Sequence, residues 1–453
     1  MKKQRPHRPS DPLLYGPLRG HWRTYLVPAL GGAAVTSVYS IVDTIAIGYG
    51  VGPAGAAAAA VLVPSFGLMA FLGTLLGMGG AILLATARGR GDRREGDAWF
   101  TLSFLLCVIV GVIVAASVLL AGDAFWRLCG ADDTIVRLAD EYGFWVVLTW
   151  PGAMLSLAMA CLVRNDGAPG YALMAIIAGG VLNILGDWLL VFPFKIGTGM
   201  AGAGIATAAG CALQTVLLVG YLFRRRSTLR FAPPSLWPRR AIRRLCAVGL
   251  APALPNAAVA VVVTLANHQA MRHGGVAALS ILGVMLSLSA LYQQLFNGVA
   301  QALQPIVSVN YGAGGRARIR RSFWLGARMA FALGLACSLL SLLFPVGTLR
   351  LFMAPTPEVI ALAPRLVRGI ASSFLPMALC ILAAGYLQAL LRTVPAATIA
   401  LLRSIGLSAA LLLALPPLLG LDGLWLALTA TEWITLLLAL VALFRLWGRE
   451  IPR

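Results

Sequence analysis

The sequence predicts an all-α, polytopic membrane protein with twelve transmembrane helices in two six-helix bundles, and three observations support this class. Only 11% of the 453 residues are charged and 59% are apolar, whereas soluble domains carry about 25% charged residues. Apolar stretches of about 20 residues or more recur from Tyr25 almost to the C-terminus, and each can cross a hydrocarbon core of about 30 Å. Lys and Arg gather in the short segments between these stretches, where topology signals lie.

The apolar stretches, taken in order, give the expected spans. The first is long, contains an acidic residue and lacks a cleavage-type tail, so we expect no cleaved targeting peptide. We expect the long second, eighth and tenth spans to tilt or to extend beyond the hydrocarbon. The expected ranges are 25–48, 54–86, 98–121, 140–163, 171–193, 201–223, 246–271, 277–308, 322–349, 359–390, 394–418 and 423–446.

Lys and Arg are distributed unevenly between the two sides of this map. The N-terminal tail holds six of them, the segment between spans two and three holds four, and residues 223–245 hold eight. The segment between spans three and four, on the opposite side, is acidic. Because cytoplasmic segments carry the excess of Lys and Arg, we expect both termini in the cytoplasm of a bacterium and the chain in its inner membrane. This arrangement requires an even number of spans.

The remaining composition excludes several classes of function. The net charge of +20 lies in topology segments, so it does not indicate a nucleic-acid groove. The seven Cys residues have no paired spacing and the four His residues form no cluster, so we expect neither a disulfide framework nor a zinc centre. No Walker A loop, HExxH or GxSxG motif occurs. We therefore expect no enzyme activity and no cofactor.

The two halves of the chain resemble each other. The basic turn ATARGRGDRREGD follows the second span and NYGAGGRARIRRS follows the eighth, offset by about 225 residues, and GMAGAGIAT and GLDGLWLAL open spans six and twelve. Six spans per half give both halves the same orientation, and duplicated bundles of this kind hold a substrate between them and alternate its access. The expected domains are an N-lobe at 1–222, a cytoplasmic basic linker at 223–245 and a C-lobe at 246–453.

Two carboxylates lie inside predicted spans, where an ionised acid costs at least about 2.5–3.5 kcal/mol and is by default a candidate functional residue. Asp43 shares a helix face of the first span with Thr36, Tyr39 and Ser40, because these residues recur at three- and four-residue steps. We expect this polar face to line a cavity. Pro28, fifteen residues before Asp43, either bends the helix or lies in its first turns, where proline is tolerated.

Asp187, the second intramembrane acid, follows Asn183 by four residues in the fifth span, so the two side chains share a helix face. Together they offer oxygen ligands for Na⁺ or a hydrogen-bond partner for a protonated acid. A polar pair that only bridges helices is the alternative.

Other polar residues inside the spans point to a function less clearly than Asp43 and Asp187 do. Glu432 is expected near the outer interface, where a structural role and a functional role are equally open. Polar residues in spans seven and eight either line a cavity or form hydrogen bonds between helices. The candidates for lining a cavity are Asn256, Gln293, Asn297 and Gln301.

Three stretches carry a resemblance to a known family. They are VPAL and SIVDTIAIG in the first span, NILGDWLLVFPFKIGTGMAGAGIAT in spans five and six, and QALQPIVSVNYGAGGRAR after span eight. With the layout of six plus six spans, they resemble the multidrug and toxic compound extrusion (MATE) transporters of the MOP superfamily, in particular the DinF-like and MepA-like branches. The resemblance covers nearly the whole chain.

The family's site residues can be carried over one at a time. DinF-like members have a proline and an aspartate fifteen residues apart in the first span, as Pro28 and Asp43 are here. Their fifth span has an Asn and an Asp four residues apart, matched by Asn183 and Asp187, and Thr207 matches a threonine in the sixth. The resemblance implies that four of these residues hold H⁺ or Na⁺ in the N-lobe: Asp43, Asn183, Asp187 and Thr207. It also implies that Pro28 lies at a helix bend.

The C-lobe departs from the pattern of NorM-like members, which carry acids in spans seven and ten. Neither span has an acid in its interior here, and Glu358 lies at the outer entrance to the tenth. The resemblance therefore implies coupling through the N-lobe alone.

These observations lead to the hypothesis of an antiporter that exports amphipathic, often cationic, drugs or toxic metabolites in exchange for H⁺ or Na⁺, working as a monomer in the bilayer. A lipid-linked saccharide flippase of the same superfamily is the alternative, and its basic cavity would need interior cations such as Arg164 and Arg403. A membrane-embedded enzyme or a receptor-like protein lacks a catalytic constellation and does not explain the duplication.

Overall fold

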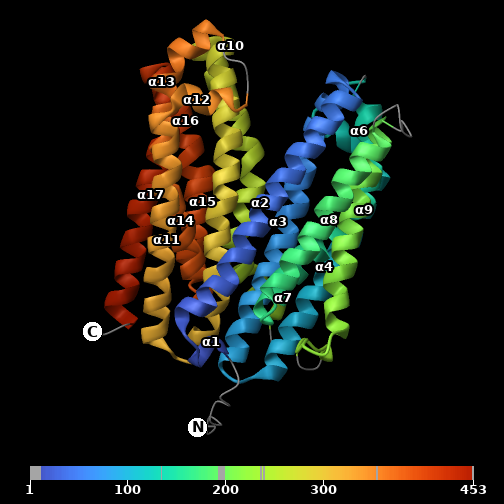
Figure 1. Ribbon diagram of the computed structural model, residues 1–453, viewed down its shortest axis with the longest axis vertical. Coiled ribbons are helices and arrows are strands. Elements are labelled where there is room, and N and C mark those ends of the chain that lie inside the picture. The colour runs from blue at the N-terminus through green and yellow to red at the C-terminus, as the bar shows by residue number, and fades with distance from the viewer. Residues whose placement is uncertain are drawn as a thin grey trace. The chain divides into compact units, whose positions relative to one another are not determined.

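The computed structural model describes residues 12–133, 135–191, 199–234, 237, 240–352 and 356–450. Every regular element in these residues is a helix, and no strand occurs among them (Figure 1). This confirms the all-α class. Long apolar helices are the expected solution in lipid, because a helix satisfies its backbone hydrogen bonds within one segment.

The number of membrane-crossing helices agrees with the prediction once one long helix is divided. Ten helices in the described residues have the length and composition to cross a bilayer, and the pair α6 (Val136–Leu148) and α7 (Trp150–Asn165), bent by 51°, makes an eleventh. Helix α10 (Ala241–Gly312) has 72 residues, or roughly 110 Å at 1.5 Å per residue. Gly275 breaks it with φ 61° and ψ −158°, which only glycine adopts readily. One span before Gly275 and one after it bring the number of spans to the predicted twelve.

The chain forms two compact units. The first comprises residues up to Ala257 together with Ser308–Gly314, and the second comprises Ala258–Val307 and Gly315 onward. The helices of the first unit, besides α6, α7 and the ends of α10, are α1 (Pro12–Tyr15), α2 (Leu18–Gly50), α3 (Pro53–Gly89), α4 (Arg93–Ala121), α5 (Asp123–Leu128), α8 (Pro169–Leu190), α9 (Gly199–Gly220) and the 3-10 turn η1 (Tyr221–Phe223).

The second unit contains the middle of α10 and the remaining helices. A π-helical segment, η3, interrupts the span between α15 and α16. The elements are α11 (Arg316–Leu343), α12 (Pro345–Arg350), α13 (Pro357–Ala371), α14 (Phe374–Ala389), α15 (Thr393–Leu401), η3 (Leu402–Gly406), α16 (Leu407–Leu419) and α17 (Leu421–Glu450).

The described part of the linker is held against the first unit. Asp166, fully buried at the end of α7, accepts hydrogen bonds from the Tyr221 hydroxyl at 2.8 Å and from the Thr228 backbone N–H at 2.9 Å, and it pairs with Arg88 at 2.6 Å. Phe231 packs its ring against Phe100 and Phe104 of α4. Thr228 and Phe231 thus anchor this largely exposed segment to α4 and to the end of α7.

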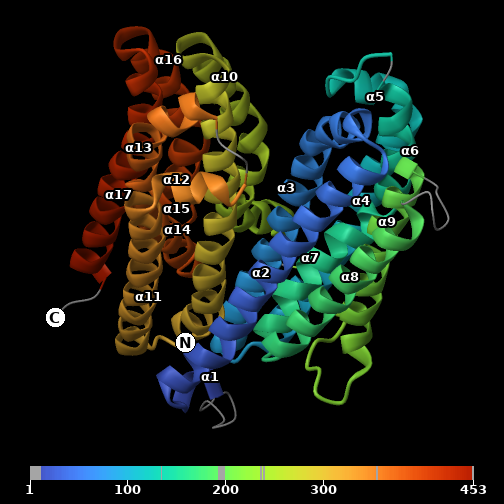
Figure 2. The same ribbon diagram turned by 45° about the horizontal axis from the view of Figure 1, so that its top comes forward.

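Helix α8 packs between α2 and α9 (Figure 2), and small residues allow the close approach to α9. A Cβ atom at Gly210 of α9 would lie 2.6 Å from the carbonyl oxygen of Gly179, and one at Gly186 of α8 would lie 2.7 Å from the Ala206 Cβ. Small residues at helix contacts let backbones meet where lipid supplies no hydrophobic driving force. This contact sets the register of the polar residues on α8 and α9.

Gly210→Ala is therefore expected to destabilise the protein by about 1–3 kcal/mol, because its methyl group has no space against the α8 backbone. Gly220→Ala at the end of the same helix is the matched control, since a Cβ there meets nothing within 4 Å, and alanine favours the helix by up to about 1 kcal/mol. Thermal unfolding of the purified variants in detergent measures the difference. Equal unfolding midpoints for both variants would contradict the close α8–α9 contact.

Candidate ion-coupling site in the first unit

Four polar residues predicted from the sequence come together from three helices of the first unit. Asp43 lies on α2, Asn183 and Asp187 lie one turn apart on α8, and Thr207 lies on α9. Because α8 packs against both other helices, its polar face meets theirs. Asn183 and Asp187 are 5% and 1% exposed, so this polar group is enclosed by apolar helices.

A chain of hydrogen bonds connects three of these residues through a fourth side chain. The Asn183 amide donates to the Thr207 hydroxyl at 3.3 Å, and the Thr207 and Tyr142 hydroxyls are 3.4 Å apart. The Tyr142 hydroxyl donates to Asp43 Oδ2 at 3.4 Å. Since a phenol has one proton to donate, Thr207 must be the donor to Tyr142. The chain thus runs in one direction and ends on the Asp43 carboxylate.

The sequence reasoning missed Tyr142. It lies on α6 in the stretch DEYGFW, where it reads as one more aromatic residue at the start of an apolar span. A glycine on α9 brings it to the site, because a Cβ at Gly204 would lie 2.7 Å from the Tyr142 carbonyl oxygen. The ring is 2% exposed, so only the hydroxyl is available for polar contacts.

Four buried oxygen atoms in this group have no hydrogen-bond partner among the described residues. They are Asp43 Oδ1, Asn183 Oδ1 and both carboxylate oxygens of Asp187. Buried polar atoms in proteins are nearly always satisfied, and an exception calls for an explanation. Asp187 is the clearest case, because Asp43 receives at least the Tyr142 hydroxyl.

This set of atoms suits either a proton or a hard cation. Carboxylate, amide and hydroxyl oxygens are the ligands that hard cations prefer. A proton on one carboxyl would equally provide a donor for the neighbouring acid, since Asp43 and Asp187 are close enough to interact. The described residues contain no group of three or more His, Cys, Asp or Glu side chains that would hold a transition metal.

The other residues predicted on α2 take different positions. Pro28 lies in the interior of α2, well past the first turn that begins at Leu18, so the first-turn alternative does not describe it. Tyr39 packs beside Gly180 of α8, whose Cβ would lie 3.0 Å from the Tyr39 ring. Thr36 is partly buried and Ser40 is exposed. Their role in lining a cavity stays a prediction.

The candidates on α10 divide between the two units. Asn256 belongs to the first unit and its amide donates to the Thr74 hydroxyl of α3 at 3.5 Å, so it forms a bond between helices. Gln293, Asn297 and Gln301 belong to the second unit and are all partly buried. Gln293 joins a second polar network, described next, and the role of the other two in a cavity stays a prediction.

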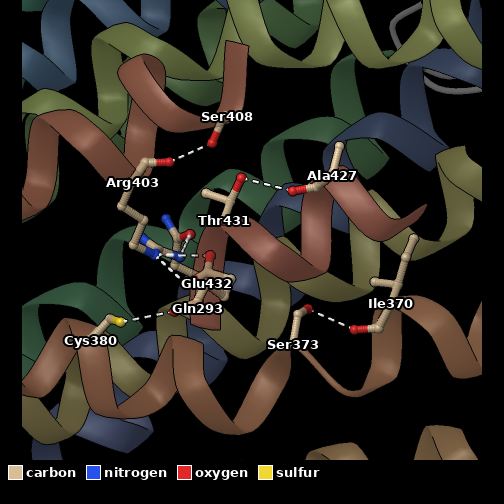
Figure 3. A network of polar contacts seen from close by, with 9 residues as sticks. All are labelled: Gln293, Ile370, Ser373, Cys380, Arg403, Ser408, Ala427, Thr431 and Glu432. Carbon is tan, nitrogen blue, oxygen red and sulfur yellow. Dashed lines mark hydrogen bonds and ion pairs between the residues drawn. The ribbon is translucent and has the colours of Figure 1, made fainter. Parts of the chain in front are cut away.

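The second network centres on an ion pair inside the second unit (Figure 3). Arg403 Nε donates to the Glu432 carboxylate oxygens at 2.9 and 2.8 Å, and Arg403 Nη2 donates to Gln293 Oε1 at 3.3 Å. Glu432 lies roughly 16 Å along α17 and Arg403 about 15 Å beyond the start of α15. Both lie inside helices long enough to cross a core of about 30 Å, and the expectation that Glu432 lies near the outer interface stays a prediction.

Comparison with known proteins identifies relatives of this chain. The family profile described as MatE matches residues 28–189 and 253–413. The second match begins 225 residues after the first, which is the offset that the sequence repeats predict. A multidrug export protein MepA of Staphylococcus saprophyticus is 23% identical over 63% of each chain, and that of Staphylococcus haemolyticus is 21% identical over 94% of this chain and 93% of its own.

Solved structures have the same fold. A multidrug resistance MATE family transporter of the MOP superfamily in an outward-facing conformation has a TM-score of 0.88 at 21% identity, covering 98% of this chain and 99% of its own. A MOP superfamily transporter from Pyrococcus furiosus, described as having a binding pocket of reverse polarity that suggests a different function, has the same score at 20% identity, covering 96% and 98%. Because the MatE profile matches most of both halves, the chain belongs to the MATE family of membrane transporters.

Proposed function

We propose that this protein is an antiporter that exports amphipathic, often cationic, drugs or toxic metabolites in exchange for H⁺ or Na⁺. The staphylococcal relatives are named multidrug export proteins, which supports the direction of transport and the class of substrate. The observation that supports ion coupling most strongly is Asp187, whose two carboxylate oxygens are buried without a partner among the described residues.

The proposed coupling follows from the free-energy cost of burying an ionised carboxylate in an apolar interior. An ionised Asp187 without donors is unfavourable in an apolar interior, so a proton or Na⁺ at Asp43 and Asp187 stabilises the polar group. The arriving ion also cancels negative charge that attracts a cationic substrate, and the substrate is released. Coupling between two sites is reciprocal. Substrate binding must therefore favour release of the ion, which is the exchange that an antiporter performs.

The flippase alternative receives less support from the charges. It calls for interior cations that bind a pyrophosphate, and Arg403 is the interior candidate of the second unit. The Glu432 carboxylate lies 2.8 Å from the Arg403 guanidinium and neutralises it, so this pair has no net charge. The polar group of the first unit is acidic.

We also propose a topology from the distribution of Lys and Arg. Both termini lie in the cytoplasm of a bacterium, the chain crosses its inner membrane, and the N-lobe, linker and C-lobe occupy 1–222, 223–245 and 246–453. The protein works as a monomer.

Asp43→Asn and Asp187→Asn are each expected to abolish uphill ethidium export, because an asparagine amide neither titrates nor carries a negative charge. Reconstituted proteoliposomes with separately imposed pH and Na⁺ gradients measure the transport and identify the coupling ion. Asp133→Asn is the matched control, since its side chain is 84% exposed, and it should transport as the original protein does. Wild-type export rates in both correctly inserted intramembrane variants would refute ion coupling at this site.

Ethidium binding is expected to displace the coupling ion from the purified protein. In weakly buffered detergent solution, added ethidium should release protons if H⁺ couples, whereas added Na⁺ should weaken ethidium binding if Na⁺ couples. Asp187→Asn should lose the response that the original protein gives. Retention of the full response in that variant would place the exchangeable ion elsewhere.

Tyr142→Phe is expected to lower the free energy of unfolding by about 0.5–2 kcal/mol, because Thr207 and Asp43 both lose a hydrogen-bond partner. The midpoint of thermal unfolding in detergent measures this loss. Tyr49→Phe provides the comparison, since Tyr49 is 84% exposed on α2. The hydrogen-bond chain is contradicted if both variants unfold at the midpoint of the original protein.

A further inference from the structure

The linker between α9 and α10 carries strong positive charge at one end of the first unit. Residues 223–245 hold eight Arg residues and no Asp or Glu, and the described part forms the light green loop at the lower end of α9 (Figure 1). Its described arginines are all exposed, and we call them the basic rim: Arg224, Arg225, Arg226, Arg230, Arg240, Arg243 and Arg244. The ion-coupling site uses none of these residues.

Aromatic rings hold two arginines of the basic rim in place. The Arg224 guanidinium lies 4.8 Å from the centroid of the Tyr171 ring at the start of α8, and the Arg244 guanidinium lies 5.7 Å from that of Trp99 in α4. Such cation–π contacts use the face of the ring. Because both arginines are also exposed, their N–H groups remain available to an anion from outside the protein.

The basic rim borders the apolar outer surface of two spans. Tyr171 lies one turn before Met174, an exposed apolar residue of α8. Phe231 packs its ring against Phe104 of α4, which is followed by the exposed Leu105. Both helices are long and apolar enough to cross a membrane, so their exposed apolar residues are expected to face lipid. The basic rim therefore lies where the hydrocarbon ends and lipid phosphate groups begin.

Two phenylalanines of the linker support this position. Phe223 ends η1 and is 88% exposed, and Phe231 is 59% exposed although one side of its ring packs against Phe100. Exposed rings are unfavourable in water. Arginines next to exposed aromatic residues are typical of segments that lie at a membrane interface.

The acidic residues beside the basic rim do not neutralise it. Asp166 is fully buried and pairs with an arginine of α3, and Glu95 pairs with Arg90, which is not part of the rim. Asp97 interacts with Arg230. The other arginines of the rim have no ion-pair partner among the described residues, so the surface stays positive.

We propose that the basic rim binds the headgroups of anionic phospholipids in the adjacent leaflet. A guanidinium group matches a phosphate with two parallel N–H groups. Clusters of about four to eight basic residues next to a membrane helix attract anionic lipids. With the proposed topology this leaflet faces the cytoplasm, and bound headgroups hold the linker against the bilayer.

Native mass spectrometry of the purified protein in detergent tests the proposal with two lipids that have the same acyl chains, phosphatidylglycerol and phosphatidylcholine. It gives an apparent dissociation constant for each lipid and requires no transport. The original protein should bind phosphatidylglycerol more tightly. Arg225→Gln combined with Arg226→Gln should weaken that binding about tenfold or more, because each arginine near an anionic surface contributes roughly fivefold. Binding of phosphatidylcholine should not change.

A matched double variant separates this surface from the net charge of the protein. Arg127→Gln combined with Arg137→Gln removes the same charge from two other exposed arginines of the first unit, and each of these already pairs with a carboxylate. This variant should leave both dissociation constants unchanged.

Three results would overturn the proposal. The original protein could bind the two lipids equally, or both double variants could weaken phosphatidylglycerol to the same extent, which would indicate attraction by net charge alone. Displacement of phosphatidylglycerol by an equal concentration of inorganic phosphate would assign the basic rim to soluble phosphates. Because the measurement requires no transport, failure of the proposed export function would leave its result unaffected.

Discussion

A carboxylate placed in the hydrocarbon core loses its hydration, and the first unit is organised around how that loss is met. Asp43 receives a directed chain of hydroxyl and amide donors that begins at Asn183, whereas Asp187 receives none from the described residues. The two neighbouring acids are therefore not equivalent. The protein holds Asp43 as an acceptor, whereas an ionised Asp187 is strongly unfavourable in an apolar interior, and this difference is the basis for proposing that a proton or cation neutralises it.

This inequality depends on backbones that approach closely. Gly179, Gly186 and Gly210 let α8 and α9 meet, and Gly204 lets α6 reach α9 at Tyr142. A larger residue at any of these positions would separate the helices and lengthen hydrogen bonds that are already 3.3–3.4 Å long. Small residues thus do more than pack the helices. They also set the distances between the helices that carry Asp43, Asn183, Asp187 and Thr207.

The parts of this arrangement that hydropathy and spacing encode could be predicted from the sequence. The spans, the duplication and the group of Asp43, Asn183, Asp187 and Thr207 follow from local patterns and from the resemblance to a family. Tyr142 could not be predicted, because its partners lie 99 and 65 residues away and the close contact of Gly204 with Tyr142 forms only in the folded chain. The Arg403–Glu432 contact was missed for a related reason, since the two residues lie 29 positions apart on different helices.

The two units of this duplicated chain place charge in the membrane by different means. Among the described residues, the two acids of the first unit have no basic partner, so gain or loss of a proton there would change the charge of that unit. The second pairs an arginine with a glutamate at 2.8 Å, and the arginine keeps its positive charge because it does not lose its proton in proteins. The arginine therefore cannot take up and release a coupling proton, and its contacts with Glu432 and Gln293 hold three helices together. Among its described residues, the duplicated chain thus buries acids without a basic partner in one unit and a neutralised ion pair in the other.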